Sequence, residues 1–292
     1  DGFKKILVGK DGWYFRSSQD LTTEFKVSEE NRALFKQLVT ALKAKGTDLI
    51  IAYPPTRGMT AGAYLPDDLK GYDPAAATML YNDLIKTMNN DGINFVGQSA
   101  PKSGAGYFYK ADLHWTSDGA RDMAQAVAEM AKKLPSYKEL KKVEFRNEAL
   151  PDAPDEQKFA EALEGICDLS PQPEMATLNK TVPAKTTSTS ADLFSSDFPQ
   201  VVLIGTSNSN RDDNDMNFSG RLKEELSADV YNAAVAGGGL EDSLLTYLSS
   251  KEYRETPPKI IVWEIPGYYN LDGDSRTSTL RRIIPASYVS CK

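Results

Sequence analysis

The 292-residue sequence has a single histidine and only two cysteines, and these scarce residues restrict its chemistry. One histidine argues against histidine-rich metal sites, and any histidine-dependent reaction must use His114. Cys167 and Cys291 are compatible with one disulfide, with two free thiols, or with partners outside the sequence. We therefore expect neither a metal site nor a cofactor.

Long apolar runs and an excess of positive charge are also absent. No run approaches the roughly 18–20 apolar residues that a membrane span requires. The 34 Lys+Arg and 41 Asp+Glu give a net charge of −7, which argues against nucleic acid as the partner. The sequence begins at Asp1 without a signal peptide, so we expect either that a targeting segment was removed or that a longer protein extends beyond it.

Buried-type strands alternate with amphipathic helices along the chain, which is typical of an α/β protein. The composition, 40% hydrophobic and 26% charged, is that of an ordinary globular protein. A short hairpin is expected at Ile6–Val8 and Trp13–Phe15, around the turn at Lys10-Asp11-Gly12. The predicted strands of a mostly parallel sheet flanked by helices are Asp48–Tyr53, Ile93–Val96, Val201–Ile204, Val230–Ala233 and Ile260–Glu264. The predicted helices run at about 28–45, 74–90, 117–133, 217–226 and 240–249.

The stretch from about 135 to 198 differs in composition from the rest. It contains several prolines and the Thr/Ser run Thr186–Ser190, with a short helix expected at Asp155–Glu164. It is either a linker between two domains or an insertion over the surface. We prefer an insertion into a single domain covering 1–292, because the alternation of strands and helices resumes directly after it.

A serine-containing loop follows the predicted strand Val201–Ile204. In the sequence Gly205-Thr206-Ser207-Asn208-Ser209-Asn210, Ser207 is placed where a nucleophile would be presented. Backbone N–H groups after it, including that of Asn208, would then bind an oxyanion. The alternative is that small polar residues simply form a turn before the next helix.

The only histidine lies in Asp112-Leu113-His114-Trp115-Thr116, beside an acid. Imidazole is the natural base for a serine hydroxyl, and a carboxylate can hold the ring in one tautomer. In an extended segment, residues two apart point to the same side, so Asp112 and His114 would share a face. The alternative is a turn aspartate beside an ordinary histidine.

Three further residues follow predicted strands. Gly238, within the triplet Gly237–Gly239, suits either a second oxyanion N–H or an ordinary tight turn. Arg57 is a candidate for a substrate carboxylate, or else a structural ion-pair partner. Tyr268 is a candidate for stacking on a sugar, or else for packing.

Together, the Gly205–Ser209 loop, the Asp112–Thr116 segment and Gly9-Lys10-Asp11-Gly12-Trp13-Tyr14-Phe15 resemble the AlgX/AlgJ type of alginate O-acetyltransferases. These are members of the SGNH hydrolase-like superfamily, and the resemblance extends from Gly9 to about Ile265. Common SGNH hydrolases have the serine block first. Here the Asp/His block comes first, which implies a circularly rearranged order around the same site.

The resemblance implies a role for each residue of the triad. Ser207 matches the nucleophile, His114 the base and Asp112 the acid that orients it, in a two-step transfer of acetyl to mannuronate hydroxyls. It also implies a periplasmic location, an acetyl donor delivered by a membrane-embedded acyltransferase, and other alginate export proteins as partners. The wording of the serine block is closer to AlgX, whose C-terminal carbohydrate-binding module is not in this sequence.

Alternatives to the transferase remain at this point. A polysaccharide acetylesterase would use the same triad with water as acceptor, and a non-catalytic polysaccharide-binding assembly subunit would keep only the fold. Because alginate is a polyanion, a net charge of −7 would repel it without a local positive groove. The residues expected to form that groove are Arg57, Lys110, Arg121 and Arg211.

Overall fold

The fold was analysed in a computed structural model of the chain. It describes residues 6–155, 158–159, 163, 171–184, 198–210, 216–237, 239–272 and 281. The cysteines, Arg211, Gly238 and Thr186–Ser190 lie outside the described residues.

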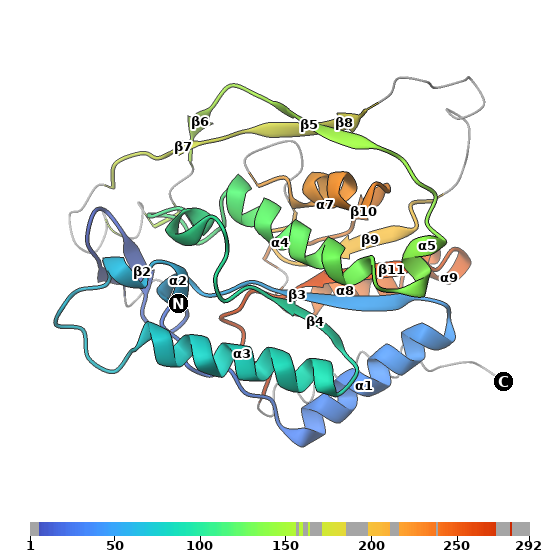
Figure 1. Cartoon of the computed structure of the whole chain (residues 1–292), viewed down its shortest axis with the longest axis horizontal. Helices are drawn as coiled ribbons and strands as arrows, with labels where there is room; N and C mark the ends of the chain where they lie inside the picture. The colour runs from blue at the N-terminus through green and yellow to red at the C-terminus, as the bar shows by residue number, and fades with distance from the viewer. Residues whose placement is uncertain are drawn as a thin grey trace.

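A five-stranded parallel sheet forms the centre of the molecule, in the order β10-β9-β11-β3-β4 (Figure 1). Its strands are β3 (Asp48–Tyr53), β4 (Asn94–Gly97), β9 (Val201–Ile204), β10 (Val230–Asn232) and β11 (Ile260–Glu264). Every residue of β3, β9 and β11 is buried, which is why these strands appear in the sequence as almost continuous apolar runs. The expected α/β architecture is therefore confirmed.

Helices cover both faces of the sheet, and alternate strand residues point to opposite layers. On one face, Ile50 and Val262 pack with α4 (Ser117–Ala131) and α7 (Phe218–Leu226). On the other, Ile51 and Trp263 pack with α1 (Glu29–Ala44), α3 (Pro74–Asn90) and α8 (Asp242–Leu248). The short helices are α2 (Arg57–Thr60), α5 (Pro135–Lys138) and α9 (Lys251–Glu255), with 3₁₀ turns η1 (Gly62–Tyr64) and η2 (Gly104–Tyr107).

Side-chain caps fix where the long helices begin. The Ser28 hydroxyl accepts a hydrogen bond from the Asn31 N–H at the start of α1. Asp73 caps α3, which has Pro74 at its first position, and Thr116 caps α4. These are the residue types that satisfy the free N–H groups of a first helical turn.

An N-terminal hairpin packs beside this core, with antiparallel strands β1 (Ile6–Val8) and β2 (Tyr14–Arg16). Asp11 and Gly12 both have positive φ, 52° and 80°, as a tight hairpin turn requires. The second strand begins one residue later than expected. Trp13 instead belongs to the turn, where its ring stacks on Tyr64 with 5.3 Å between centroids.

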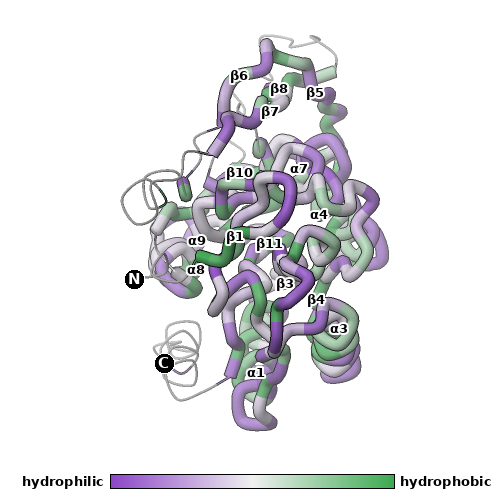
Figure 2. Tube along the Cα trace, turned by 90° about the vertical axis from the view of Figure 1, so that its left-hand side faces the viewer, coloured by the Kyte–Doolittle hydropathy of each residue, from purple (hydrophilic) through white to green (hydrophobic). Residues whose placement is uncertain are grey.

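The stretch 135–198 contains two antiparallel ribbons that the sequence did not predict. Strand β5 (Phe145–Ala149) pairs with β8 (Asn179–Pro183), and β6 (Ala153–Pro154) pairs with β7 (Met175–Ala176). These ribbons lie above α4 and α7, on the opposite side of the molecule from α1 and α3 (Figure 2). The helix expected at Asp155–Glu164 lies largely outside the described residues. Within the described part of the chain, no helix combines the length and apolar character needed to span a membrane.

Candidate active site

Ser207 lies in the loop after β9, at the carboxyl end of a strand that has neighbours on both sides. The carbonyl of Thr206 accepts hydrogen bonds from the N–H groups of Ser209 (3.1 Å) and Asn210 (3.0 Å), so the loop is a tight turn. Ser207 is partly exposed, whereas Thr206, Asn208 and Ser209 are buried. The loop therefore presents the hydroxyl of Ser207 outward while its neighbours anchor it.

Glu264, the last residue of β11, holds this loop from inside the protein and was not identified in the sequence. Its Oε2 accepts hydrogen bonds from Thr206 N (2.8 Å), Thr206 Oγ1 (2.9 Å) and Ser209 Oγ (3.1 Å). The side chain is 1% exposed, and burial raises the pKa of its carboxyl although these hydrogen bonds oppose the rise. The close approach of Glu264 also explains the glycine at position 205, because a Cβ there would lie 2.6 Å from Glu264 Oε2.

Asp112 and His114 lie in a loop closed by a bridge between Phe108 and Trp115. The loop is a series of bends rather than the expected extended segment. The two side chains meet because Asp112 Oδ1 accepts hydrogen bonds from both the backbone N–H of His114 (2.8 Å) and its Nδ1 (2.6 Å). An aspartate that binds the N–H two residues ahead is a common turn-forming arrangement.

The structure brings the three predicted triad residues together. His114 Nε2 lies 2.9 Å from Ser207 Oγ, on the side of the ring opposite Asp112. Burial alone would raise the pKa of Asp112, but hydrogen bonds from His114 and Lys158 N–H leave it below its usual value. An ionised Asp112 only accepts hydrogen bonds, so Nδ1 carries the proton and Nε2 is free to accept the serine proton.

A tryptophan next to His114 links the two loops. The indole Nε1 of Trp115 donates to the carbonyl of Asn208 at 3.0 Å, and Trp115 is fully buried. His114 and Ser207 are thus held by the contact between their neighbours, Trp115 and Asn208, as well as by their own contact.

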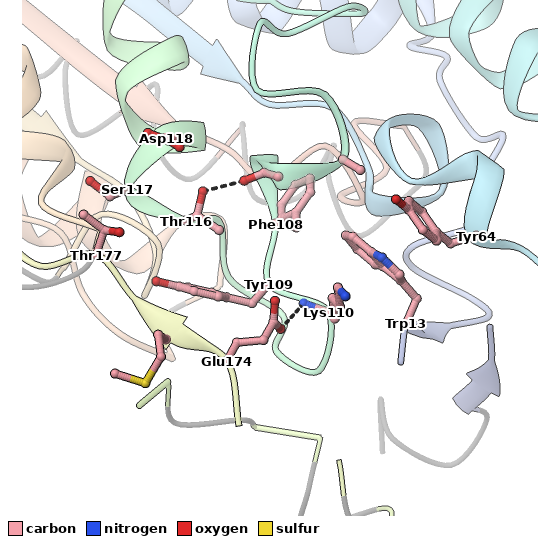
Figure 3. A pocket seen from close by; sticks show the side chains of 13 residues that line it. Trp13, Tyr64, Phe108, Tyr109, Lys110, Thr116, Ser117, Asp118, Glu174 and Thr177 are labelled. Carbon is pink, nitrogen blue, oxygen red and sulfur yellow. Dashed lines mark hydrogen bonds between the residues drawn. The ribbon is translucent and has the colours of Figure 1, made fainter. Parts of the chain in front are cut away.

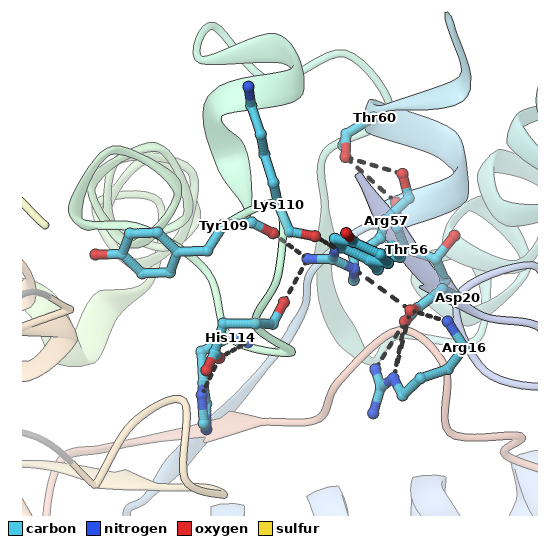
Figure 4. A network of polar contacts seen from close by, with 10 residues as sticks. Arg16, Asp20, Thr56, Arg57, Thr60, Tyr109, Lys110 and His114 are labelled. Carbon is cyan, nitrogen blue, oxygen red and sulfur yellow. Dashed lines mark hydrogen bonds and ion pairs between the residues drawn. The ribbon is translucent and has the colours of Figure 1, made fainter. Parts of the chain in front are cut away.

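Arg57 lies inside the protein beside Asp20, which fits the structural alternative rather than contact with a substrate carboxylate. Its side chain is 1% exposed, and its guanidinium donates to the carbonyls of Tyr14 (2.7 Å), Tyr109, Lys110 (2.8 Å) and Asp112 (2.5 Å) (Figure 4). Burial lowers its pKa to about 10, so it stays charged at neutral pH. Arg57 braces the loop that carries Asp112 and His114, and it is not available at the surface.

Comparison with known proteins identifies the family of this chain. A family model described as "SGNH hydrolase-like domain, acetyltransferase AlgX" matches residues 6–267. The chain belongs to the AlgX family. Pseudomonas aeruginosa "Alginate biosynthesis protein AlgX" is 34% identical over 288 residues, covering 97% of this chain and 59% of the relative. The chain therefore spans about three fifths of the length of that relative.

Two solved structures share the fold of this AlgX-family chain. The structure titled "Structural and functional characterization of Pseudomonas aeruginosa AlgX" superposes with a TM-score of 0.85 at 32% identity, covering 99% of this chain and 67% of that one. The "O-Acetyltransferase Domain of Pseudomonas putida AlgJ" gives 0.76 at 26% identity, covering 97% of this chain and 99% of that one. The expected SGNH hydrolase-like fold and the closer likeness to AlgX are thus confirmed.

The other predicted site residues of this AlgX-family chain do not all reach the triad. The side chain of Asn208 turns inward, with Nδ2 3.3 Å from Glu264 Oε1, and its backbone N–H lies 3.3 Å from Thr206 Oγ1. Binding of an oxyanion by that N–H stays a prediction. Tyr268 is partly exposed and lies against the guanidinium of Arg16, which is 4.6 Å from its ring centroid. Its contact with a sugar stays a prediction. Gly238 lies outside the described residues.

The expected positive groove is only partly present. Arg57 is buried, and Arg121 is paired with Asp118 at 3.0 Å. Lys110 is partly exposed, and its Nζ contacts the carbonyl of Asp11 at 3.2 Å. Among the described residues, no three His, Cys, Asp or Glu side chains are grouped so as to hold a metal ion.

Proposed function

We propose that this AlgX-family chain is an alginate O-acetyltransferase in which Ser207 carries the acetyl group. The observation that supports this most directly is the continuous contact from Asp112 through His114 to Ser207, at 2.6 Å and 2.9 Å. Such a relay activates a hydroxyl that is otherwise a weak nucleophile. We also propose that residues 1–292 form a single catalytic domain with an insertion at about 135–198.

The reaction has two steps. Ser207 Oγ attacks the carbonyl carbon of the acetyl donor while His114 Nε2 takes the serine proton, and the departing group of the donor then receives that proton. A mannuronate hydroxyl next attacks the acetyl ester and gives its proton to His114. The ester bond to Ser207 breaks, and the serine oxygen recovers the proton. Asp112 stabilises the imidazolium in both steps.

The partners form a further part of the proposal. The acceptor is alginate or a similar acidic polysaccharide, and a membrane-embedded acyltransferase supplies the acetyl group. The location is periplasmic, and other alginate export proteins act beside it. The names of the relatives, an alginate biosynthesis protein and an O-acetyltransferase domain, support this assignment.

A direct test uses an activated acetyl ester, with and without unacetylated mannuronate oligomers, and follows the products by mass spectrometry. The expected result is an acetyl mass on Ser207 and then on the oligomer. Both should fall by at least about a thousandfold in Ser207→Ala and His114→Ala. Ester hydrolysis that oligomers do not divert would instead indicate an esterase. Oligomer binding without any turnover would indicate an assembly subunit.

A further inference from the structure

A cavity of about 280 Å³ lies beside the catalytic loop, and neither His114 nor Ser207 lines it. Two of its lining residues, Lys110 and Thr116, are each two positions from a triad residue, Asp112 and His114 respectively. The lining also includes Glu174 and Thr177, which flank β7, and Glu174 contacts Lys110 directly (Figure 3). The cavity is thus built jointly by the catalytic core and the ribbon that the 135–198 stretch contributes.

The size and shape of the cavity suit one sugar ring. Its volume lies just below the roughly 300–1,000 Å³ typical of pockets for larger small molecules. Aromatic rings line it, among them the stacked pair Trp13 and Tyr64, together with Phe108 and Tyr109 (Figure 3). Trp13, Phe108 and Tyr109 are almost buried, so each offers only a small part of its ring to the apolar C–H surfaces of a pyranose.

Lys110 is the one cationic side chain among the described residues that line this cavity, and it could bind the carboxylate of a sugar. Asp118 is already paired with Arg121, and Glu174 accepts hydrogen bonds from the N–H groups of Lys110 and Ala111. Lys110 Nζ contacts only a backbone carbonyl, and no carboxylate within the described residues pairs with it. Its positive charge is therefore available to a bound anion, whereas Asp118 is paired with a cation and the carboxylate of Glu174 is held by backbone N–H groups and keeps its charge.

Hydrogen bonds from one buried residue also connect the cavity to the triad. Arg57 donates to the carbonyls of Tyr109 and Lys110, which line the cavity, and to that of Asp112 in the triad. One buried guanidinium therefore holds both sites in a fixed relation. The cavity and the triad therefore share the loop that Arg57 braces.

We propose that this cavity is a subsite for one uronic acid residue of the polysaccharide, with Lys110 binding its carboxylate. The proposal rests on the proposed function, since it assigns the subsite that positions the acceptor. The proposal also gives a role to β7, because Glu174 and Thr177, which flank this strand, line the subsite.

Filling the cavity tests the proposal. Gly106 lines it, has no positive φ, and would place a Cβ in open space, so a phenylalanine fits without backbone strain and occupies the cavity. Binding of unacetylated mannuronate oligomers is measured by calorimetry in a Ser207→Ala background, where no turnover occurs. We expect Gly106→Phe to weaken binding by about tenfold or more, a free-energy change that calorimetry resolves readily. Gly106→Ala should bind like the parent.

Removing the charge supplies a second test that does not depend on Gly106→Phe folding. Lys110→Met should weaken oligomer binding about fivefold at low salt and remove most of its salt dependence. Lys251→Met, on the surface of α9, is the matched control and should change neither. Unchanged binding in both Gly106→Phe and Lys110→Met, or no oligomer binding by the parent, would overturn the subsite. Acetylation of Ser207 by the activated ester tests the proposed function separately.

Discussion

Replacing Arg57 by methionine should destabilise the protein strongly, because no other residue fills its place. The guanidinium donates four hydrogen bonds to carbonyls of Tyr14, Tyr109, Lys110 and Asp112, and its Nε lies 3.3 Å from Asp20. Hydrogen bonds to charged groups contribute about 1.5–3 kcal/mol each, but desolvation of the guanidinium offsets much of the sum. Breaking a buried charged contact typically costs about 3–5 kcal/mol, which is the loss of unfolding free energy we expect.

The assay is urea unfolding followed by circular dichroism, with the activated-ester reaction measured under native conditions. Arg146→Met is the matched control, since Arg146 pairs with Glu148 on the surface and is 54% exposed. It should cost no more than about 1 kcal/mol. Arg57→Lys should recover little, because one ammonium cannot reproduce a planar fork of donors.

In Arg57→Met protein that still folds, the loop that carries Asp112 and His114 should also be distorted. Under native conditions, we expect Arg57→Met to lower the rate of Ser207 acetylation, because Asp112 and His114 depend on the braced carbonyls. A loss of stability no greater than that of Arg146→Met would refute the reasoning. So would an acetylation rate equal to that of the parent.

Substitutions at three other positions probe the triad and the loop that carries Ser207. Gly205→Ala should cost about 1–3 kcal/mol in urea unfolding, because its Cβ would press on Glu264. Glu264→Gln should keep most of the acetylation rate, since its amide oxygen still accepts from Thr206. Glu264→Ala should lose most of that rate. Equal acetylation rates in these two variants would contradict the role of Glu264. Asp112→Asn should slow acetylation by about 10⁴-fold by favouring the wrong histidine tautomer. It should also remove the stability that ionised Asp112 contributes. That contribution is present above the unfolded pKa of about 3.9 and is lost as pH falls through the lowered folded pKa, which a pH series of unfolding free energies measures.

The central sheet could be predicted because strands that are buried on both faces are almost continuously apolar in sequence. Strands β3, β9 and β11 were expected with the bounds that the structure has, and so was helix α3 after its Asp73 cap. Strands β5 and β8 were not expected. Their residues are largely polar and half-exposed, and their pairing joins segments about thirty residues apart, so no local pattern distinguishes them from loops.

The triad was predictable because its chemistry limits the residue types, and the chain has only one histidine to use. The supporting residues Arg57 and Glu264 could not be predicted. A buried arginine and a surface arginine cannot be told apart in a sequence. For this reason the sequence left Arg57 open between a substrate contact and a structural role. The one available signal for Glu264 was a carboxylate at the end of an otherwise apolar strand, Ile260–Glu264, next to a loop that begins with Gly205.

The order of the strands has a consequence for how the protein is made. Strand β11 is the last of the sheet to be synthesised, yet it lies between β9 and β3 and is the strand that joins them. A nascent chain that lacks it has two separate pieces of sheet with a row of unsatisfied backbone groups on each facing edge. The same strand ends in Glu264, the carboxylate that holds the nucleophile loop. Closure of the core and ordering of the Ser207 loop therefore become a single late event, and a partly translated chain lacks the contact between Ser207 and His114.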